Sequence, residues 1–237
     1  PGHPKFSIAL ESVRDLQLLE FILDHVPHPV VDPKVISAFQ KIVSDATLPE
    51  LGGDRSNGRD TQFELYVYAV CCAAGMSNVC LNEPDIVCTA HGIEWKIAAK
   101  RIKKTKKFMP RLSEGAKQVA QAGAPGVIIV DSCLMFNPEN NPVGRGSEEV
   151  FINALANRIN KFVKTQYHQM VNSLAHKSVL GVLIHDHNVK SEEGDDWNLK
   201  TLTFHVPVFA DGGHEDPRFK AFREMYVSPL PNVKPTN

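Results

Sequence analysis

Two acidic residues and a lysine have a spacing that could place them on one face of a β-hairpin. The dipeptide Pro84-Asp85 is followed along the chain by the tripeptide Glu94-Trp95-Lys96. Two carboxylates suit a hard divalent cation such as Mg²⁺, which keeps some of its waters for use as a nucleophile. A lysine beside them could orient or deprotonate that water, or neutralise charge that develops on a phosphoryl group. The alternative is an exposed hairpin with ordinary surface charges.

The turn between the two segments decides whether these three side chains meet. Side chains of a strand point alternately to opposite faces, so Glu94 and Lys96 share a face. If His91-Gly92 forms a two-residue loop, the residues opposite Glu94 and Lys96 are Thr89 and Val87. Asp85 then projects from that same face. A three-residue loop would break the alternation unless a bulge restored it.

With these residues the chain resembles the PD-(D/E)XK nuclease superfamily, whose fold is restriction-endonuclease-like. The resemblance rests on Pro84-Asp85 and Glu94-Trp95-Lys96, and on the order of elements from about 60 to 131, about a third of the chain. It implies an α/β fold with a mixed central β-sheet flanked by helices. It also implies a nuclease that uses Mg²⁺, or Mn²⁺ as a substitute, to hydrolyse DNA, with DNA favoured over RNA. Asp85 and Glu94 would hold the metal and Lys96 would position the attacking water.

The helix expected over 60–74 could add a third acidic group. Phe63, Val67 and Val70 have helical apolar spacing, and members of the superfamily often carry a metal-binding acidic residue here, to which Glu64 corresponds. Thr61 and Glu64 also have the spacing of a capping box, in which Glu64 would bond the start of its own helix. Against this, Glu64 shares a stripe with Val67, so we expect it to point inward.

A basic segment follows the motif. Between Lys96 and Arg111 there is no acidic residue, whereas the whole chain has a net charge of −1. Such a run could be a solvated loop. Its place beside a carboxylate pair instead favours a phosphate track with salt-dependent binding. The residues expected to bind nucleic acid are Lys100, Arg101, Lys103, Lys104, Lys106, Lys107 and Arg111.

The remaining sequence extends this core. A helix over 113–121, capped by Ser113 and ended by Gly123, leads to an apolar strand over 127–130. On this helix, Gln118 corresponds to a glutamine that touches the site in several branches of the superfamily, although a polar helix face explains it equally well. A long helix over 147–175 and strands over 179–185 and 201–209 follow. Those two strands could extend the sheet edge or pair as a hairpin.

Length and composition limit the organisation of the protein. We expect a helical N-terminal portion, residues 1–58, split by prolines, and a nuclease domain over 59–237, unless the two form one continuous domain. No run of 18 apolar residues occurs, so we expect no membrane span. The five cysteines lack metal-site spacing, which favours reduced thiols in an intracellular, cytoplasmic protein. The first residue is Pro1 rather than Met, which is consistent with a piece of a longer protein; homo-oligomers are also compatible with the sequence.

The function expected from these features is an endonuclease of restriction, repair or antiviral defence. One alternative keeps the fold without the chemistry, as a catalytically inactive nucleic-acid-binding or scaffold module. Another is a small-molecule α/β enzyme that uses His185 and His187, which flank Asp186 at the end of an expected strand. No serine-hydrolase or P-loop motif occurs.

Overall fold

The computed structural model describes residues 4–29, 32–44, 57–123, 125–138, 148–174, 178–191, 197–207 and 215–230. The longer helices are α1 (Pro4–His25), α2 (Pro33–Ser44), α3 (Asn57–Ala73), α4 (Phe108–Ala122), α6 (Glu148–Leu174) and α7 (Pro217–Val227). Two short helical turns are η1 (Thr105–Lys107) and α5 (Cys133–Phe136). The strands are β1 (Ser77–Asn82), β2 (Asp85–Ala90), β3 (Ile93–Arg101), β4 (Gly126–Asp131), β5 (Val179–Ser191) and β6 (Trp197–Pro207).

The six strands form one mixed sheet in the order β1-β2-β3-β4-β5-β6. β3, β4 and β5 run parallel, while β1-β2-β3 and β5-β6 are antiparallel. Helix α4 makes the crossover from β3 to β4, and α6 lies between β4 and β5 in the chain. The fold is therefore the predicted α/β class with a mixed sheet flanked by helices, and the last two strands pair as a hairpin.

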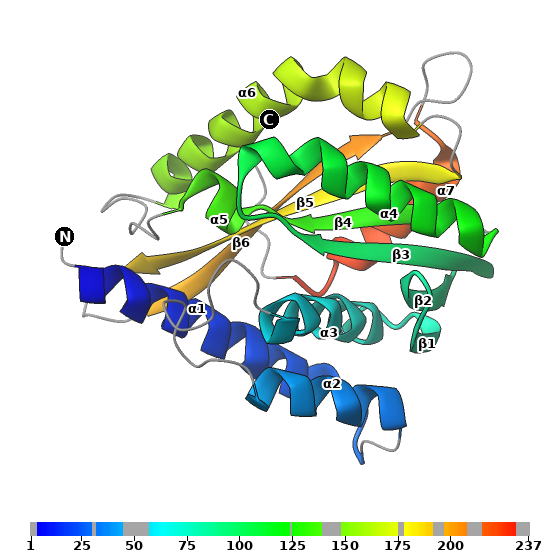
Figure 1. The fold of residues 1–237 in the computed structure, drawn as a ribbon, viewed down its shortest axis with the longest axis horizontal. Coiled ribbons are helices and arrows are strands. Elements are labelled where there is room, and N and C mark those ends of the chain that lie inside the picture. The colour runs from blue at the N-terminus through cyan, green and yellow to red at the C-terminus, as the bar shows by residue number, and fades with distance from the viewer. Residues whose placement is uncertain are drawn as a thin grey trace.

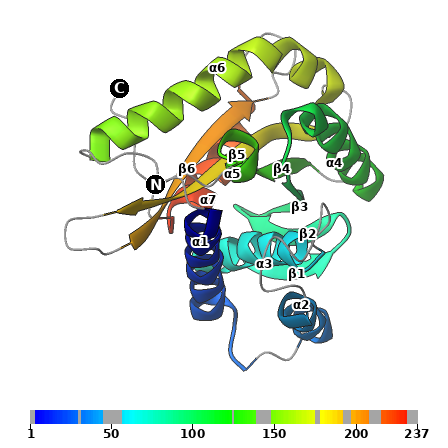
Figure 2. The same ribbon diagram turned by 60° about the vertical axis from the view of Figure 1, so that its left-hand side comes forward.

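Helices cover both faces of the sheet (Figures 1 and 2). α4 and α6 lie on one face, and α1, α2 and α3 lie on the other. β4 shows why the sheet is buried from both sides: Val127 and Ile129 join the core beneath α3, whereas Ile128 and Val130 join the core beneath α4 and α6. Alternation of side chains along a strand thus divides one apolar run between two cores. Within the described residues no helix has the length and apolarity to cross a membrane.

Two helix starts differ from the expectation. α4 begins at Phe108, with Pro110 in its first turn, so Ser113 lies inside the helix and does not cap it. α3 begins at Asn57, which places Thr61 inside that helix as well. Proline is tolerated in a first turn, where its missing N–H has no helical partner, so Pro110 permits the earlier start of α4. The predicted stop of α4 is confirmed, since Gly123 has φ 74° in the left-handed region.

Helix α7 packs on β5 at a position where only glycine fits. A Cβ added to Gly181 would lie 2.1 Å from Cζ of Phe219, whose ring is fully buried. The aromatic ring therefore rests directly on the strand backbone. This contact joins the C-terminal helix to the core that α3 also covers.

We predict that Gly181→Ala lowers the free energy of unfolding by about 1–3 kcal/mol, because the added methyl group overpacks this contact. Urea unfolding measures the change. In a Phe219→Ala background the same substitution should cost much less, because the ring that it meets is gone. Equal costs in both backgrounds would show that Phe219 is not the obstacle.

Candidate active site

The β2–β3 hairpin has the predicted loop and the predicted pairs. Thr89 lies opposite Glu94 and Val87 opposite Lys96. His91 and Gly92 have φ values of 50° and 75°, as a tight two-residue turn of this kind requires. The alternation of side chains worked out from the sequence is therefore confirmed, and Asp85, Glu94 and Lys96 belong to the same set of alternating positions.

The same register keeps Asp85 and Glu94 apart along the hairpin. Glu94 lies near the turn, whereas Asp85 is the first residue of β2 at the other end. Continuing the register by one residue places Asp85 opposite Ala98, four residues beyond Glu94 and thus about 13 Å along the strand. Lys96 Nζ instead lies 3.0 Å from Oε1 of Glu94, whose side chain is 60% exposed. The prediction that Asp85 and Glu94 share one cation beside Lys96 is therefore wrong. Residues that point to the same face of a hairpin can still lie far apart along it.

Asp85 has a different lysine as its partner. Its Oδ2 accepts hydrogen bonds from Lys100 Nζ at 2.7 Å and from the backbone N–H of Ala99 at 2.8 Å. The side chains of Lys100 and Asp85 are only 8% and 12% exposed. Lys100 lies two residues past Ala98, the residue opposite the first residue of β2, so its long side chain can reach back to Asp85. The sequence did not predict this role, because Lys96 and Lys100 both lie two residues from Ala98 and the register alone does not choose between them.

Glu64 is the second carboxylate near this pair. Its pKa is raised to about 7, mainly by burial and next by the neighbouring Asp85 carboxylate, while Lys100 opposes the change. The pKa of Asp85 is also raised by burial, against the effect of Lys100. The capping-box alternative for Glu64 is wrong because α3 begins at Asn57, about two turns before Glu64. Glu64, Asp85 and Lys100 therefore form the acidic and basic groups of the candidate site.

Packing explains why the second acid comes from α3 and not from β3. Ala98, opposite Asp85, is fully buried under α4. A Cβ added to Gly115 of α4 would lie 3.3 Å from the Cβ of Ala98, so helix and strand approach closely there. A carboxylate at position 98 would have no room and no solvent. Gln118 lies one turn further along α4, and within the described chain its buried Oε1 has no hydrogen-bond partner.

The chemistry of Asp85 and Glu64 fits a hard divalent cation. Both provide oxygen ligands, and the raised pKa of each means that Lys100 does not fully offset the cost of burying their negative charges. A cation such as Mg²⁺ would supply the missing positive charge. Among the residues with described positions, no three His, Cys, Asp or Glu side chains converge as a metal cage. Mg²⁺ here would thus be held by two carboxylates and retain waters, which is its usual behaviour in proteins.

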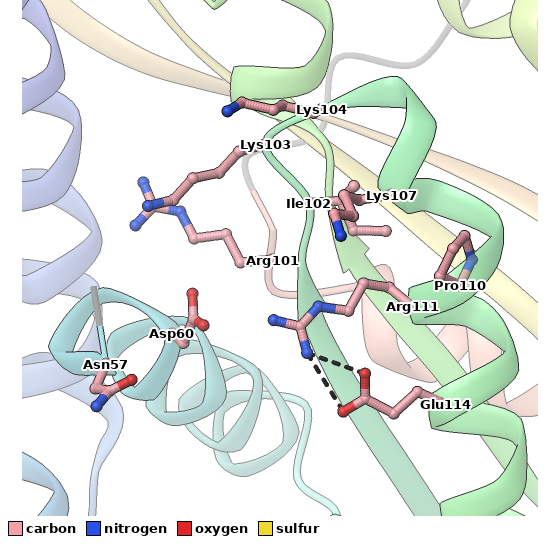
Figure 3. Close-up of a pocket in the computed structure, with 10 residues that line it drawn as sticks. All are labelled: Asn57, Asp60, Arg101, Ile102, Lys103, Lys104, Lys107, Pro110, Arg111 and Glu114. Atoms are coloured by element: carbon pink, nitrogen blue, oxygen red, sulfur yellow. Dashed lines mark hydrogen bonds and ion pairs between the residues drawn. The ribbon is translucent and has the colours of Figure 1, made fainter. Parts of the chain in front are cut away.

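The basic segment divides into a buried part and a part that lines a pocket. Lys100 and Arg101 are buried, and Arg101 pairs with Asp131 at 3.3 Å and with Glu11 at 3.7 Å. These two residues are committed to internal ion pairs and do not form an open phosphate track. Lys106 is exposed outside the pocket. The pocket has a volume of about 730 Å³ and is lined by Asn57, Asp60, Arg101, Ile102, Lys103, Lys104, Lys107, Pro110, Arg111 and Glu114 (Figure 3).

The histidines of β5 belong to the interior of the protein. His185, Asp186 and His187 are fully buried. Nε2 of His185 lies 3.1 Å from the hydroxyl of Tyr226, and Asp186 pairs with Arg158 at 2.8 Å. Burial, and next the positive charge of Arg14, lower the pKa of His187 to about 3. This ring therefore stays neutral at physiological pH. A dissolved substrate would not reach these rings, which disfavours a small-molecule enzyme built on them.

Comparison of the chain with models of known protein families and with curated proteins finds no match.

The raised pKa of Glu64 predicts a pH-dependent stability in the presence of a chelator. The unfolded carboxyl titrates near 4.5 and the folded one near 7, so the folded state binds the proton more tightly. The free energy of unfolding should then fall as the pH rises from 4.5 to 7, by on the order of 1–3 kcal/mol. Glu64→Gln cannot ionise and should be more stable than the unchanged protein above pH 7, with no such gain below pH 4.5.

Urea unfolding across this pH range measures the difference. Glu94→Gln, which removes the exposed carboxylate of β3, is the matched control for the loss of one charge. A gain of the same size in both variants would assign the effect to the net charge of the chain and not to the burial of Glu64.

Proposed function

We propose that the protein is a metal-dependent nuclease that hydrolyses phosphodiester bonds, with DNA as the substrate favoured by the resemblance. The observation that carries the proposal is the ion pair of Asp85 with Lys100 near the end of β3, with which the Glu64 carboxylate of α3 interacts electrostatically. Glu64 is thus the second carboxylate of the cluster. A pocket lined by five basic residues lies nearby. The assignment replaces Glu94 and Lys96 by Glu64 and Lys100, while Asp85 keeps its expected role.

Each group has a defined task in this proposal. Asp85 and Glu64 would hold Mg²⁺, or Mn²⁺ in its place. When bound, such a metal lowers the pKa of a coordinated water and offsets charge on the phosphoryl oxygens. Lys100, fixed by Asp85 at 2.7 Å, presents its ammonium group to the reacting phosphate and neutralises charge as the water oxygen bonds to phosphorus. The attacking water gives up a proton to the solvent, the bond from phosphorus to the leaving sugar oxygen breaks, and that oxygen takes up a proton from solvent water.

The buried surroundings of the lysine support this role over a surface charge. Lys100 is 7% exposed and is held by Asp85, whose other bond is to the strand backbone at Ala99. Its ammonium group is therefore positioned before any substrate arrives. Electrostatic stabilisation is most effective from such preorganised groups in a partly desolvated site.

One observation favours a second candidate function. Ala98 occupies the position opposite Asp85, so β3 supplies no carboxylate there and a metal would be held by Asp85 and Glu64 alone. With so few metal ligands, the chain could bind nucleic acid through the same face without cutting it. The inactive nucleic-acid-binding module is therefore the alternative, and it differs from the first proposal in its dependence on Glu64 and on metal.

The two proposals are separated by a cleavage assay with linear DNA and supercoiled plasmid, in Mg²⁺, in Mn²⁺ and in EDTA. The nuclease proposal predicts cleavage only with metal. It also predicts rate losses of about a hundredfold or more in Asp85→Asn, Glu64→Gln and Lys100→Met, because each removes a group that holds the metal or neutralises the reacting phosphate.

Matched controls come from the neighbouring pair on the same strand. Glu94→Gln and Lys96→Met alter the same residue types but should cut near the unchanged rate. Thermal unfolding of every variant excludes loss of fold as the cause, which matters most for Lys100→Met because it leaves Asp85 without its partner. Binding of DNA without metal-dependent cleavage would support the inactive module. Loss of cleavage in the Lys96 variant with retention in the Lys100 variant would reverse the present assignment.

A further inference from the structure

The cationic pocket is lined by residues of α3, β3 and α4 and lies near the C-terminal end of β3. Asn57 and Asp60 come from the first turn of α3, Arg101 from the end of β3, and Arg111 and Glu114 from the start of α4. Asp60 of the pocket lies one helical turn before Glu64 on α3, and its charge acts on the Glu64 carboxyl, so this pocket lies near the cluster of Asp85, Glu64 and Lys100. Figure 3 shows side chains from all three elements around one open space.

The charge of the pocket is strongly positive. Its lining contains five basic residues and two acidic ones, in a chain whose net charge is −1. The acidic residues are Asp60 and Glu114, and Glu114 is already paired with Arg111 at 3.0 Å. Burial lowers the pKa of Lys103, and the nearby guanidinium of Arg101 lowers it further, so these cations are held closer together than they would be in water. An anion in this space would relieve their repulsion.

The shape of the pocket indicates that it suits one phosphate group and not a row of phosphates. Arg101 and Lys103 point to the same side of the pocket, and Arg111 approaches from α4 across from Asp60 (Figure 3). Lys106, in the middle of the basic run, is exposed outside it. Five basic residues thus line one concavity. Its volume of about 730 Å³ is that of a small-ligand site, which typically measures about 300–1,000 Å³, so it suits a single nucleotide and not a duplex.

We propose that this pocket binds the phosphomonoester at a single-stranded end of a nucleic acid. This inference rests on the nuclease function proposed above, and it names the part of the substrate that would be recognised. A terminal phosphomonoester carries a charge of about −1.5 to −2 at pH 7, whereas each phosphodiester carries one negative charge. Several cations that line one concavity therefore gain more from the terminal group, and a concavity admits that group more readily than the middle of a chain.

The proposal also changes the expected position of cleavage. With the end of a strand held in the pocket, the phosphodiester that reaches Asp85 and Lys100 lies within the first few nucleotides. Cleavage would then start near an end, in contrast to the internal cleavage expected from the resemblance alone.

Fluorescence anisotropy in EDTA tests recognition without hydrolysis. The probes are a single-stranded oligonucleotide with an internal fluorophore, carrying a 5′-phosphate, a 3′-phosphate or two hydroxyl ends, and its blunt duplex. We expect one phosphorylated single strand to bind about tenfold more tightly than the hydroxyl form, because the extra charge meets several donors. Whether the 5′-phosphorylated or the 3′-phosphorylated strand binds more tightly then shows which end is recognised.

Variants then locate the recognition. Lys103→Gln with Arg111→Gln should remove the preference for the phosphorylated end, whereas Lys106→Gln, in the same run but outside the pocket, should keep it. Equal losses in the pocket and Lys106 variants would indicate a track and overturn the proposal. Thermal unfolding identifies any misfolded variant, and the single variant Lys107→Gln, at an exposed pocket residue, then repeats the test.

The result separates this inference from the function on which it rests. Equal affinity for phosphorylated and hydroxyl ends, together with metal-dependent cleavage that requires Asp85, would overturn the end-recognition proposal alone. A clear preference for a phosphorylated end without any cleavage would support the pocket and count against the nuclease.

Discussion

The site depends on one buried carboxylate that satisfies β3 where its neighbouring strand ends. β2 begins at Asp85, and beyond that point β3 has a strand, β4, on one side only, so its N–H groups on the β2 side need another acceptor. Oδ2 of Asp85 accepts from the backbone of Ala99 and from Lys100, so one side chain completes the sheet edge and fixes the lysine. Burial opposes this arrangement by raising the pKa of Asp85, and the ammonium group of Lys100 offsets part of that cost. Structure and proposed chemistry therefore use the same contact, and neither partner can be changed without affecting both.

The sequence predicted much of the scaffold because its signals were local. The glycine turn after β2, the apolar run of β4 and the helix stop at Gly123 each depend on residues close in the chain. The predicted pairs of the hairpin are confirmed for the same reason. The site was partly missed because it depends on distance and on tertiary packing. The register alone does not choose between Lys96 and Lys100, and the tight contact of Ala98 with Gly115 joins segments whose spacing no local pattern records.

A buried charge network explains why part of the basic run has a structural role. Arg101 pairs with Asp131 of β4 and with Glu11 of α1, and Glu11 also pairs with Arg59 of α3. Burial alone would raise the pKa of Asp15, next to this group on α1, but the surrounding arginines lower it. Removing one charge would leave its partners buried without compensation, which is strongly destabilising. The network thus connects the N-terminal helix to α3 and the sheet. The buried core beneath α3 likewise includes Leu18 and Ile22 of α1.

Some basic residues are held in internal ion pairs and others line the pocket, and this difference determines where the protein can attract an anion. A chain with a net charge of −1 has little long-range attraction for nucleic acid, so binding has to come from local excess charge. Arg101 adds positive potential to the pocket wall, but its ion pairs fix its position. Lys103 and Arg111, from the loop and from α4, are less buried and face the open space. A compact, highly charged group can contact several of these cations at once, whereas each phosphate of an extended chain brings only one negative charge, so the pocket favours the compact group.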